Sequence, residues 1–238
     1  MKAVTAPVKN ISRFSDAMEA VTTHAHRDER MVLIYGATGV GKSTALAYFM
    51  NRFNAIYVEA SPAWSIGSML RVIVSAAGHA PKGRSIADME QQIVDEMAGE
   101  GRPLFIDELD YLFLPGQQTS LRMLEALHSI HDKSRMPVVM VGMDQIDRRL
   151  KLREQIARRI DQWVPFTDLD REDARTVADS LSEIAIEDDL LDRLFVETQG
   201  RMGRIRLGLA QAERFAKSKK WDRIDLDRWG NRAWNLGR

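Results

Sequence analysis

The stretch that decides the fold is GATGVGKS, residues 36–43, which satisfies the pattern GxxxxGK[ST] at every fixed position. It follows the apolar run MVLIY, residues 31–35, and precedes a segment with the apolar spacing of a helix, residues 43–53. Glycines let the backbone curl so that successive N–H groups point at phosphate oxygens, and a helix start adds partial positive charge there. The strand, loop and helix together predict a loop that binds the phosphates of a nucleoside triphosphate.

Each part of this loop has an expected contact with ATP and Mg²⁺, the two cofactors that the motif predicts. Lys42 can reach the β and γ phosphates and is a predicted catalytic residue, and the Ser43 hydroxyl can bind the magnesium ion. The residues expected to contact the nucleotide are Gly36, Ala37, Thr38, Gly39, Val40, Gly41, Lys42, Ser43 and Thr44.

A second motif, LFIDELD (residues 104–110), is an apolar strand that ends in two carboxylates. Asp107 can hold the magnesium shell. Glu108 can take a proton from the water that attacks the γ-phosphate, or orient that water; the alternative is a solvated strand end. One strand, residues 55–59, lies between the two motifs in the chain. With a Glu beside the Asp, this order favours ATPases that carry their own catalytic glutamate over small-molecule kinases and Ras-like GTPases.

Apolar strands alternate with helices along most of the chain, which predicts an α/β fold. The expected strands are residues 31–35, 55–59, 103–107, 137–142 and a short fifth at 163–166; the expected helices are residues 15–26, 43–53, 65–77, 86–98 and 121–131. Right-handed crossovers would place helices on both faces of a mostly parallel, five-stranded sheet, giving a three-layer sandwich.

The strand signal stops after Phe166, and residues 172–184, 188–197 and 204–217 are expected to be helices only. We therefore expect a nucleotide-binding α/β core over residues 1–167. Residues 168–238 are expected to form a small helical lid with a basic C-terminal tail, because so few residues do not suit a large independent domain.

Composition excludes several classes of protein. The chain has 238 residues, of which 45 % are hydrophobic and 29 % are charged, and it has no cysteine, so disulfides are excluded. No apolar run approaches the ~20 residues that cross a bilayer. We therefore expect no membrane partner and a cytoplasmic location, in the host cell if a phage encodes the protein.

Charge is unevenly distributed although the formal net charge is zero. Residues 201–238 contain eleven Lys and Arg against four Asp and Glu, so residues 1–200 carry the balancing negative excess. Two interpretations stay open: a solvated basic helix, or a patch that contacts a polyanion such as DNA.

The motifs GATGVGKS and FIDELD, with the strand PVVMVG (residues 137–142), give the chain a specific resemblance. Residues 10–215 resemble an AAA+ ATPase of the group that contains the transposition B proteins of Mu-like phages and the transposon ATPases of the TniB and TnsC type. The resemblance implies a homo-oligomer, a filament or ring, that assembles with ATP on double-stranded DNA without sequence preference. It further implies target selection and stimulation of a transposase in DNA recombination.

The same resemblance implies further site residues. Asp144 is the candidate for the polar sensor 1 residue after the fourth strand, although Met143 has the more usual position; the alternative is a helix N-cap before Ile146. Arg159, or Arg158, would reach the ATP of a neighbouring subunit as an arginine finger; the alternative is a surface helix with pairs such as Glu154 and Arg158. Arg204 and Arg206 are equal candidates for the sensor 2 arginine, with solvent-facing arginines as the alternative.

The biological role stays open between three hypotheses. The first is the transposition accessory ATPase. The second is another DNA-associated AAA+ ATPase, in replication or helicase loading. The third is an ATP-driven scaffold or secretion ATPase that does not act on nucleic acid. The tryptophans at 221, 229 and 234 lie among basic residues, and packing of the tail against the lid is favoured over stacking on bases.

Overall fold

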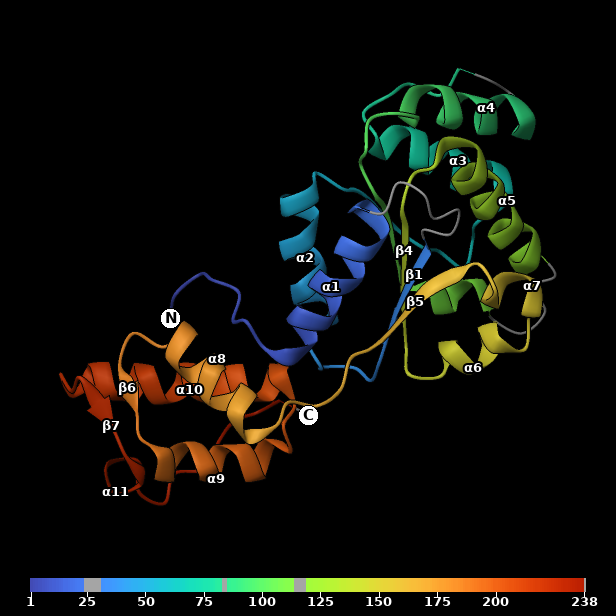
Figure 1. Cartoon of the computed structure of the whole chain (residues 1–238). Helices are drawn as coiled ribbons and strands as arrows, with labels where there is room; N and C mark the ends of the chain where they lie inside the picture. The colour runs from blue at the N-terminus through green and yellow to red at the C-terminus, as the bar shows by residue number, and fades with distance from the viewer. Residues whose placement is uncertain (24–30, 83–84, 114–118, 238) are drawn as a thin grey trace. The chain divides into compact units, whose positions relative to one another are not determined.

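The computed structural model describes residues 1–23, 31–82, 85–113 and 119–237. The chain forms two compact units that alternate along the sequence (Figure 1). Residues 14–36 and 46–165 form one, which we call the sheet unit; residues 1–13, 37–45 and 166–238 form the other, the lid unit. The expected domain boundary between residues 167 and 168 stays a prediction. The compact units place the N-terminal residues and most of the phosphate-binding loop with the C-terminal helices.

The sheet unit is built on five parallel strands in the order β2-β3-β4-β1-β5. Their bounds are β1 (Met31–Tyr35), β2 (Ile56–Glu59), β3 (Leu104–Asp107), β4 (Val138–Gly142) and β5 (Ile160–Pro165). The expected α/β fold with a five-stranded parallel sheet is thus confirmed. β2 precedes β3 in the chain, but in the sheet β4 lies between β1 and β3, and β2 is at the edge.

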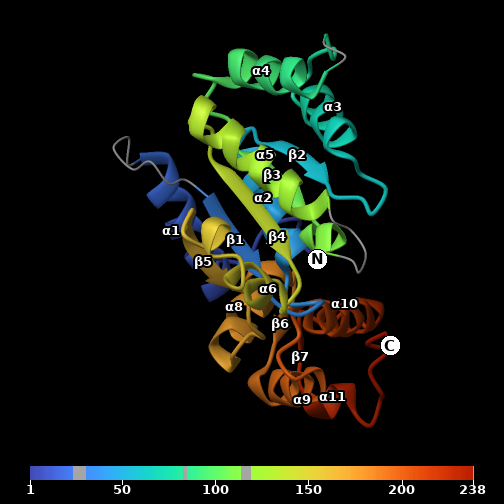
Figure 2. The same ribbon diagram turned by 90° about the vertical axis from the view of Figure 1, so that its right-hand side faces the viewer.

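Helices cover both faces of the sheet because side chains alternate along each strand. On one face, Leu33, Ile106 and Met140 belong to a core with α3 (Ile66–Ala76), α4 (Ile86–Met97) and α5 (Thr119–Ser134). On the other face, the ring of Phe105 lies 6.0 Å from Phe14, which lies 4.2 Å from Phe49. Phe14 comes from α1 (Lys9–Thr23) and Phe49 from α2 (Lys42–Phe53). Figure 1 shows the two groups of helices on opposite sides of the strands, and Figure 2 views the sheet from the side of α5.

The first helix begins six residues before the expected start at residue 15, and the expected residues 24–26 lie outside the described ones. Its early start has a tertiary cause. The Lys9 amide donates a hydrogen bond to Asp173 Oδ1 at 2.9 Å, so a carboxylate from a distant part of the chain caps the helix. By contrast, α3 and α4 begin where expected because local capping boxes, Ser65 with Ser68 and Ser85 with Asp88, satisfy their first amides.

The fifth strand is longer than the expected residues 163–166. It begins at Ile160, and its register against β1 shifts between Met31 and Val32. The irregularity places polar Asp161 and Gln162 inside a strand, which hides the apolar pattern that predicts one. The 3₁₀ helix η1 (Leu109–Phe113) was not expected. α6 (Ile146–Lys151) and α7 (Glu154–Ala157) lie where the sequence had left two helices open as alternatives, one starting at Ile146 and one at the surface with Glu154.

The lid unit contains α8 (Arg171–Leu181), α9 (Asp188–Thr198), α10 (Met202–Ser218) and α11 (Leu226–Trp229). The expectation of helices only after Phe166 is wrong, because β6 (Ala185–Ile186) pairs in parallel with β7 (Arg223–Ile224). Two-residue strands are too short to show the alternation of apolar and polar residues that predicts a strand. The buried partners Ile186 and Ile224 nevertheless hold the two connections together.

The tryptophans of the tail pack within the lid unit, as expected. Trp229 stacks on Trp234 with ring centroids 4.1 Å apart, and Trp229 and Trp221 each form a T-shaped contact with Phe215. The guanidinium of Arg228 lies 5.0 Å from the Trp221 ring. Part of the positive charge of residues 201–238 therefore holds an aromatic cluster.

A buried carboxylate in the lid unit makes its stability depend on pH. Burial alone raises the pKa of a carboxyl group, but hydrogen bonds from the Met1 amino group, Lys217 and the Glu183 amide lower the pKa of Glu213 to about 2, from 4.5. Between these values the unfolded chain binds a proton that the folded chain does not. The stabilisation is therefore complete above about pH 4.5 and is lost as the pH falls toward 2.

We expect Glu213→Gln to flatten this dependence. Between about pH 5 and pH 2.5, the urea midpoint of the wild type should fall more steeply than that of the variant, because the variant has no proton to take up. Glu197→Gln is the matched control, since Glu197 pairs with Arg193 on the exposed surface of the same unit. Parallel curves for the wild type and Glu213→Gln would contradict the assignment.

Candidate functional site

The phosphate-binding loop, residues 36–43, has the backbone that its glycines permit. Gly39 has φ of 85° and Gly41 has φ of 100°, both in the left-handed region that other residues rarely adopt. A side chain at Gly41 would also approach Met202 Cγ to 3.3 Å. α2 starts at Lys42, directly after the second of these glycines. The expected strand, loop and helix are therefore present.

Within the lid unit the loop has polar contacts of its own. The Lys42 ammonium donates to the carbonyl oxygen of Ala37 at 2.9 Å, so it lies against the loop that it is predicted to serve. Gly203, in the first turn of α10, donates its amide to the carbonyl oxygen of Gly39 at 3.0 Å. Ser43 and Thr44 lie in the first turn of α2, where their amides would face a bound phosphate.

Arg201, whose side chain contacts this loop, was not predicted from the sequence. Arg201 Nη1 donates to the carbonyl oxygen of Thr38 at 2.8 Å, and Arg201 Nε lies 3.0 Å from Asp168 Oδ1. The predicted sensor 2 candidates follow on α10; Arg204 is half-buried and Arg206 is exposed, and their roles stay predictions. The sequence could have indicated Arg201, because it directly follows Gly200 in the same basic stretch, residues 200–206, that contains Arg204 and Arg206.

In the sheet unit, the end of β3 holds its two carboxylates differently. Asp107 accepts hydrogen bonds from the Glu108 amide at 2.8 Å and from the Tyr57 hydroxyl at 3.3 Å. Burial, and then the negative charges of Asp107 and Glu59, raise the pKa of Tyr57 to about 12, so Tyr57 stays a donor at neutral pH. Tyr57 lies on β2, the neighbour of β3 in the sheet, and the sequence reasoning missed it.

Glu108 has φ of 53°, a left-handed conformation that costs a non-glycine residue about 1–2 kcal/mol. Such strain persists where the surrounding structure fixes it, and it is concentrated at functional positions. Two residues further on, Asp110 Oδ2 accepts the Met143 amide at 2.6 Å. Asp110 therefore connects η1 after β3 with the loop after β4, a role that its place in LFIDELD did not reveal.

Three of the predicted positions lie at the end of a strand of the sheet unit or shortly after it, and the three strands are neighbours. Gly36 follows β1, Asp144 follows β4, and Asp107 ends β3; these strands are adjacent in the order β3-β4-β1. Tyr35 of β1 pairs with Gly142 of β4, so the two loops leave the sheet side by side. The carboxyl edge of an open parallel sheet is where such folds bind their ligands.

Asp144 is exposed in the turn that precedes α6. The N-cap of α6 is Gln145, with no hydrogen bond from its side chain, so the interpretation of Asp144 as an N-cap is wrong. The turn is held instead by Asp110, which accepts the Met143 amide. The sensor 1 role of Asp144 stays a prediction.

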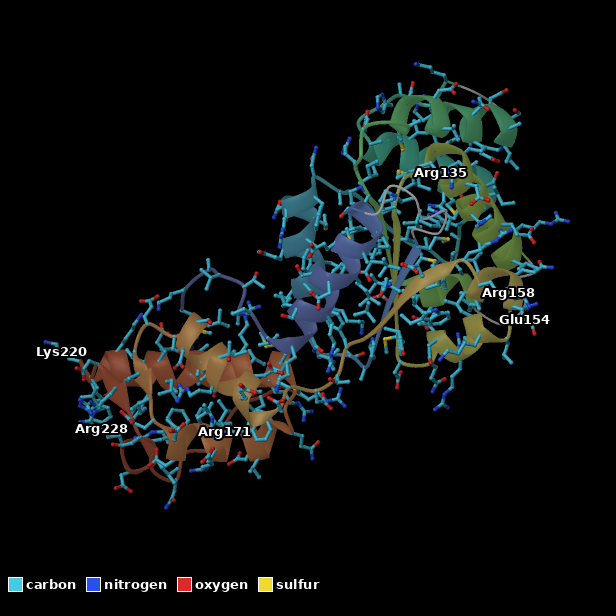
Figure 3. All side chains as sticks on the ribbon, viewed as in Figure 1. Arg135, Glu154, Arg158, Arg171, Lys220 and Arg228 are labelled. Carbon is cyan, nitrogen blue, oxygen red and sulfur yellow. The ribbon has the colours of Figure 1, made fainter. Side chains whose placement is uncertain are left out.

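The two finger candidates lie differently. Arg158 is exposed and its Nη2 lies 3.3 Å from Glu154 Oε2, a pair labelled in Figure 3, so the expected i,i+4 surface pair is present. Arg159 is half-buried and immediately precedes β5. Burial chiefly lowers the pKa of His128 on α5, and the positive charge of Arg159 also lowers it. Which arginine acts as a finger stays a prediction.

Ser43 and Asp107, the predicted magnesium ligands, offer the hydroxyl and carboxylate oxygens that Mg²⁺ prefers alongside substrate phosphates. The hydrogen bonds on Asp107 fix its carboxylate, which suits this role. Over residues 1–23, 31–82, 85–113 and 119–237, no group of three or more His, Asp or Glu side chains could hold a metal ion. Over the same ranges, no helix is both long and apolar enough to cross a membrane.

Comparison with known families and structures places this geometry in context. A family model described as "AAA domain" matches residues 25–150, more than half of the chain. The chain belongs to the AAA domain family. No curated protein sequence matches it. The finer resemblance to the Mu-like B proteins and the TniB and TnsC ATPases is not confirmed by these comparisons.

Solved structures of AAA proteins share the fold. The ORC2 protein of Aeropyrum pernix, determined as ADPNP–ADP complexes, has a TM-score of 0.72 at 18 % identity, over 96 % of this chain and 68 % of that one. Cdc6p of Pyrobaculum aerophilum has a TM-score of 0.60 at 12 % identity, over 94 % and 66 %. The Aeropyrum pernix ORC1 protein, in complex with DNA, has a TM-score of 0.59 at 17 % identity, over 95 % and 64 %. At these identities the likeness establishes the fold.

We expect Tyr57→Phe to weaken the use of Mg²⁺ by the AAA domain, because Asp107 would lose the hydroxyl that fixes its carboxylate. The Mg²⁺ concentration that half-saturates ATP binding should rise roughly tenfold, the usual effect of losing an outer-shell partner. A fluorescent ATP analogue titrated at a series of Mg²⁺ concentrations gives this value. Tyr48→Phe, at an exposed tyrosine of α2, is the control, and equal Mg²⁺ dependence in both variants would contradict the role of Tyr57.

Proposed function

We propose that this AAA domain protein is a magnesium-dependent ATPase that hydrolyses ATP to ADP and phosphate. The observation that carries the proposal is the pairing of two motifs with their local geometry. The phosphate-binding loop turns through left-handed Gly39 and Gly41, and β3 ends in Asp107 followed by a strained Glu108. The adenine nucleotides in the ORC2 structure of the same fold agree with it.

In the proposed reaction each residue has one task. The loop amides and Lys42 would bind the β and γ phosphates, while Ser43 and Asp107 would hold a magnesium ion, which would neutralise the charge of these phosphates. Glu108 accepts the proton of the attacking water; the new bond joins that oxygen to the γ-phosphorus, and ADP departs with the electrons of the broken bond.

We expect Glu108→Gln to bind ATP normally and to hydrolyse it at least ~100-fold more slowly, because an amide cannot accept the proton. Nucleotide titration and phosphate release measure the two effects separately. Glu59→Gln is the matched control, since Glu59 ends the neighbouring strand β2 opposite Asp107. Undiminished turnover in Glu108→Gln would reject Glu108 as the base.

The active form in this proposal is a homo-oligomer, a filament or a ring. Arg159 would act on the ATP of a neighbouring subunit, with Arg158 as the second candidate. The half-buried position of Arg159 before β5 favours it, since Arg158 already pairs with Glu154 at the surface. Asp144 after β4 and either Arg204 or Arg206 on α10 would sense the γ-phosphate within the subunit.

We expect Arg159→Ala to lower turnover by roughly 10³-fold in assembled protein, the usual effect of removing an arginine finger. Arg158→Ala should cost far less, because it removes only an exposed surface pair. Mixing Arg159→Ala with Glu108→Gln should restore some turnover, since each variant supplies what the other lacks across the interface. A mixture no more active than its components would show that the arginine does not act in trans.

We propose that the assembled ATPase binds double-stranded DNA as a partner, without sequence preference. The basic excess of residues 201–238 supports this, as does the DNA complex of the ORC1 protein with the same fold. Arg228 and Arg232 of this stretch lie over aromatic rings, but Arg206, Arg214, Lys219 and Lys220 are exposed. Such charges bind phosphates and release counterions, so the affinity should depend strongly on salt.

Within this class, we propose that the protein is a transposition accessory ATPase that selects target DNA and stimulates a transposase partner. The resemblance of GATGVGKS and FIDELD to the Mu-like group supports this role. A replication or helicase-loading ATPase is the second candidate, and the fold shared with ORC and Cdc6 proteins favours it. A scaffold or secretion ATPase, the third candidate, would respond to a protein partner and not to DNA.

Filter retention of duplex DNA with ATP at ~50 mM salt tests the common part of the first two roles. We expect retention that requires ATP, that is similar for unrelated sequences and that falls steeply with added salt. Electron microscopy of the same samples should show assemblies. Absence of retention would reject DNA as a binding partner and favour the scaffold role. Addition of a transposase separates the first two candidates, because only the transposition role predicts faster ATP hydrolysis and target selection.

A further inference from the structure

Three consecutive carbonyl groups of the phosphate-binding loop accept hydrogen bonds from residues outside the loop. Arg201 Nη1 donates to Thr38 at 2.8 Å, and the Gly203 amide donates to Gly39 at 3.0 Å. Asn10 Nδ2 donates to Val40 over a longer distance, 3.4 Å. All these residues belong to the lid unit. We call this set of three donors the carbonyl clamp.

The clamp acts on the amides that are predicted to bind phosphate. A trans peptide group is planar, so the C=O of one residue points opposite to the N–H of the next. Donors that hold the carbonyls of residues 38, 39 and 40 therefore also fix the directions of the amides of residues 39, 40 and 41, each opposite to the carbonyl before it. Those amides belong to the predicted phosphate nest. The clamp thus orders the nest before ligand binds, which reduces the entropic cost of binding.

Asn10 is suited to this task because it is buried and fully engaged. Only 3 % of the surface of Asn10 is exposed. Besides its contact with the loop, Nδ2 donates to the carbonyl oxygen of Thr167 at 2.8 Å, and Oδ1 accepts the Thr167 amide at 3.3 Å. An amide group suits this arrangement because its nitrogen has two hydrogens to donate and its oxygen accepts.

Arg201 is held in place by its surroundings. Its Nε lies 3.0 Å from Asp168 Oδ1 while Nη1 reaches the loop, so one planar guanidinium connects the two. The preceding residue, Gly200, has φ of 73°, and a side chain there would come within 2.3 Å of the carbonyl oxygen of Leu169. Glycine is therefore required at the turn that presents Arg201 at the start of α10.

Both side chains of the clamp are anchored on consecutive residues. Asn10 binds Thr167 and Arg201 binds Asp168, and these two residues lie in the segment between β5 and α8. A change in the loop backbone must therefore alter contacts that also hold this connecting segment. By linkage, whatever the clamp contributes to phosphate binding, phosphate binding contributes equally to ordering the segment.

We propose that Asn10 and Arg201 are positioning residues that preorganise the phosphate nest and couple its occupancy to the segment from Thr167 to Asp168. The coupling rests on the proposed binding of ATP. The ordering of the loop does not, since its contacts join residues of this chain alone.

The test compares the wild type with Asn10→Ala and Arg201→Lys. Asn10→Ala removes the amide without changing charge. Arg201→Lys keeps the positive charge but loses the fork that reaches Thr38 and Asp168 together. Arg214→Ala is the control, because Arg214 is exposed on the same helix. Arg201 is partly exposed, so Arg201→Lys should fold even if the buried Asn10→Ala does not.

The first measurement is hydrogen exchange of the peptide spanning residues 36–45 in nucleotide-free protein. We expect roughly fivefold faster exchange in Asn10→Ala and in Arg201→Lys than in the wild type or Arg214→Ala, because the lost contacts restrained the loop. Exchange unchanged in the folded variants would overturn the clamp. This arm does not depend on ATP binding.

The second measurement is binding and turnover with ATP and ADP. We expect both variants to bind both nucleotides roughly five- to tenfold more weakly, with kcat at saturation nearly unchanged, since the nest binds phosphates common to both. In the wild type, nucleotide should also slow exchange over residues 166–171, and the variants should lose this protection. Wild-type protein that binds no ATP would reject the proposed function and the coupling with it. Wild-type protein that binds ATP, with variants equal to it, would reject the coupling alone.

Discussion

The hydrogen bonds that hold the backbone of the phosphate-binding loop are the constraint on which the rest of the predicted site depends. Gly39 and Gly41 adopt left-handed conformations, so the loop has no regular secondary structure of its own to fix its amides. An isolated glycine-rich loop would sample many conformations at a large entropic cost. Here the fixed elements on either side and the carbonyl contacts within the lid unit restrict those conformations. A phosphate would meet amides that are already aligned.

The end of β3 differs from the loop, because backbone strain there is concentrated in one residue, Glu108. Glu108 is left-handed without being glycine, while Asp107 beside it is held by a tyrosine hydroxyl and a backbone amide. A carboxylate that must hold a metal is best fixed, whereas a carboxylate that must exchange a proton needs access to water. One dipeptide thus presents two carboxylates in two environments. Asp110 extends the arrangement by fixing the turn after β4.

Features that neighbouring residues determine could be predicted from the sequence, whereas features that long-range tertiary contacts determine could not. The pattern GATGVGKS lies between an apolar strand and a helix, so loop, strand and helix all followed from about twenty residues. A helix begins at Lys9 because Asp173 caps it, and no residue near Lys9 in the sequence predicts that contact. Tyr57 reaches Asp107 only through strand pairing, and Arg201 reaches Thr38 across more than 160 residues of sequence. β6 and β7 are paired over only two residues, too few for any periodic pattern.

The composition of the lid unit has a consequence for how the chain is made. Its core joins Ala6 and Val8, near the beginning of the sequence, with Ile224 and Trp229, near the end. During synthesis residues 1–13 leave the ribosome before the helices of residues 166–238 that bury them. The five strands of the sheet unit end at residue 165, so all of them are made before those helices. Ala6 and Val8 should therefore stay exposed in the nascent chain until after the sheet unit has been synthesised.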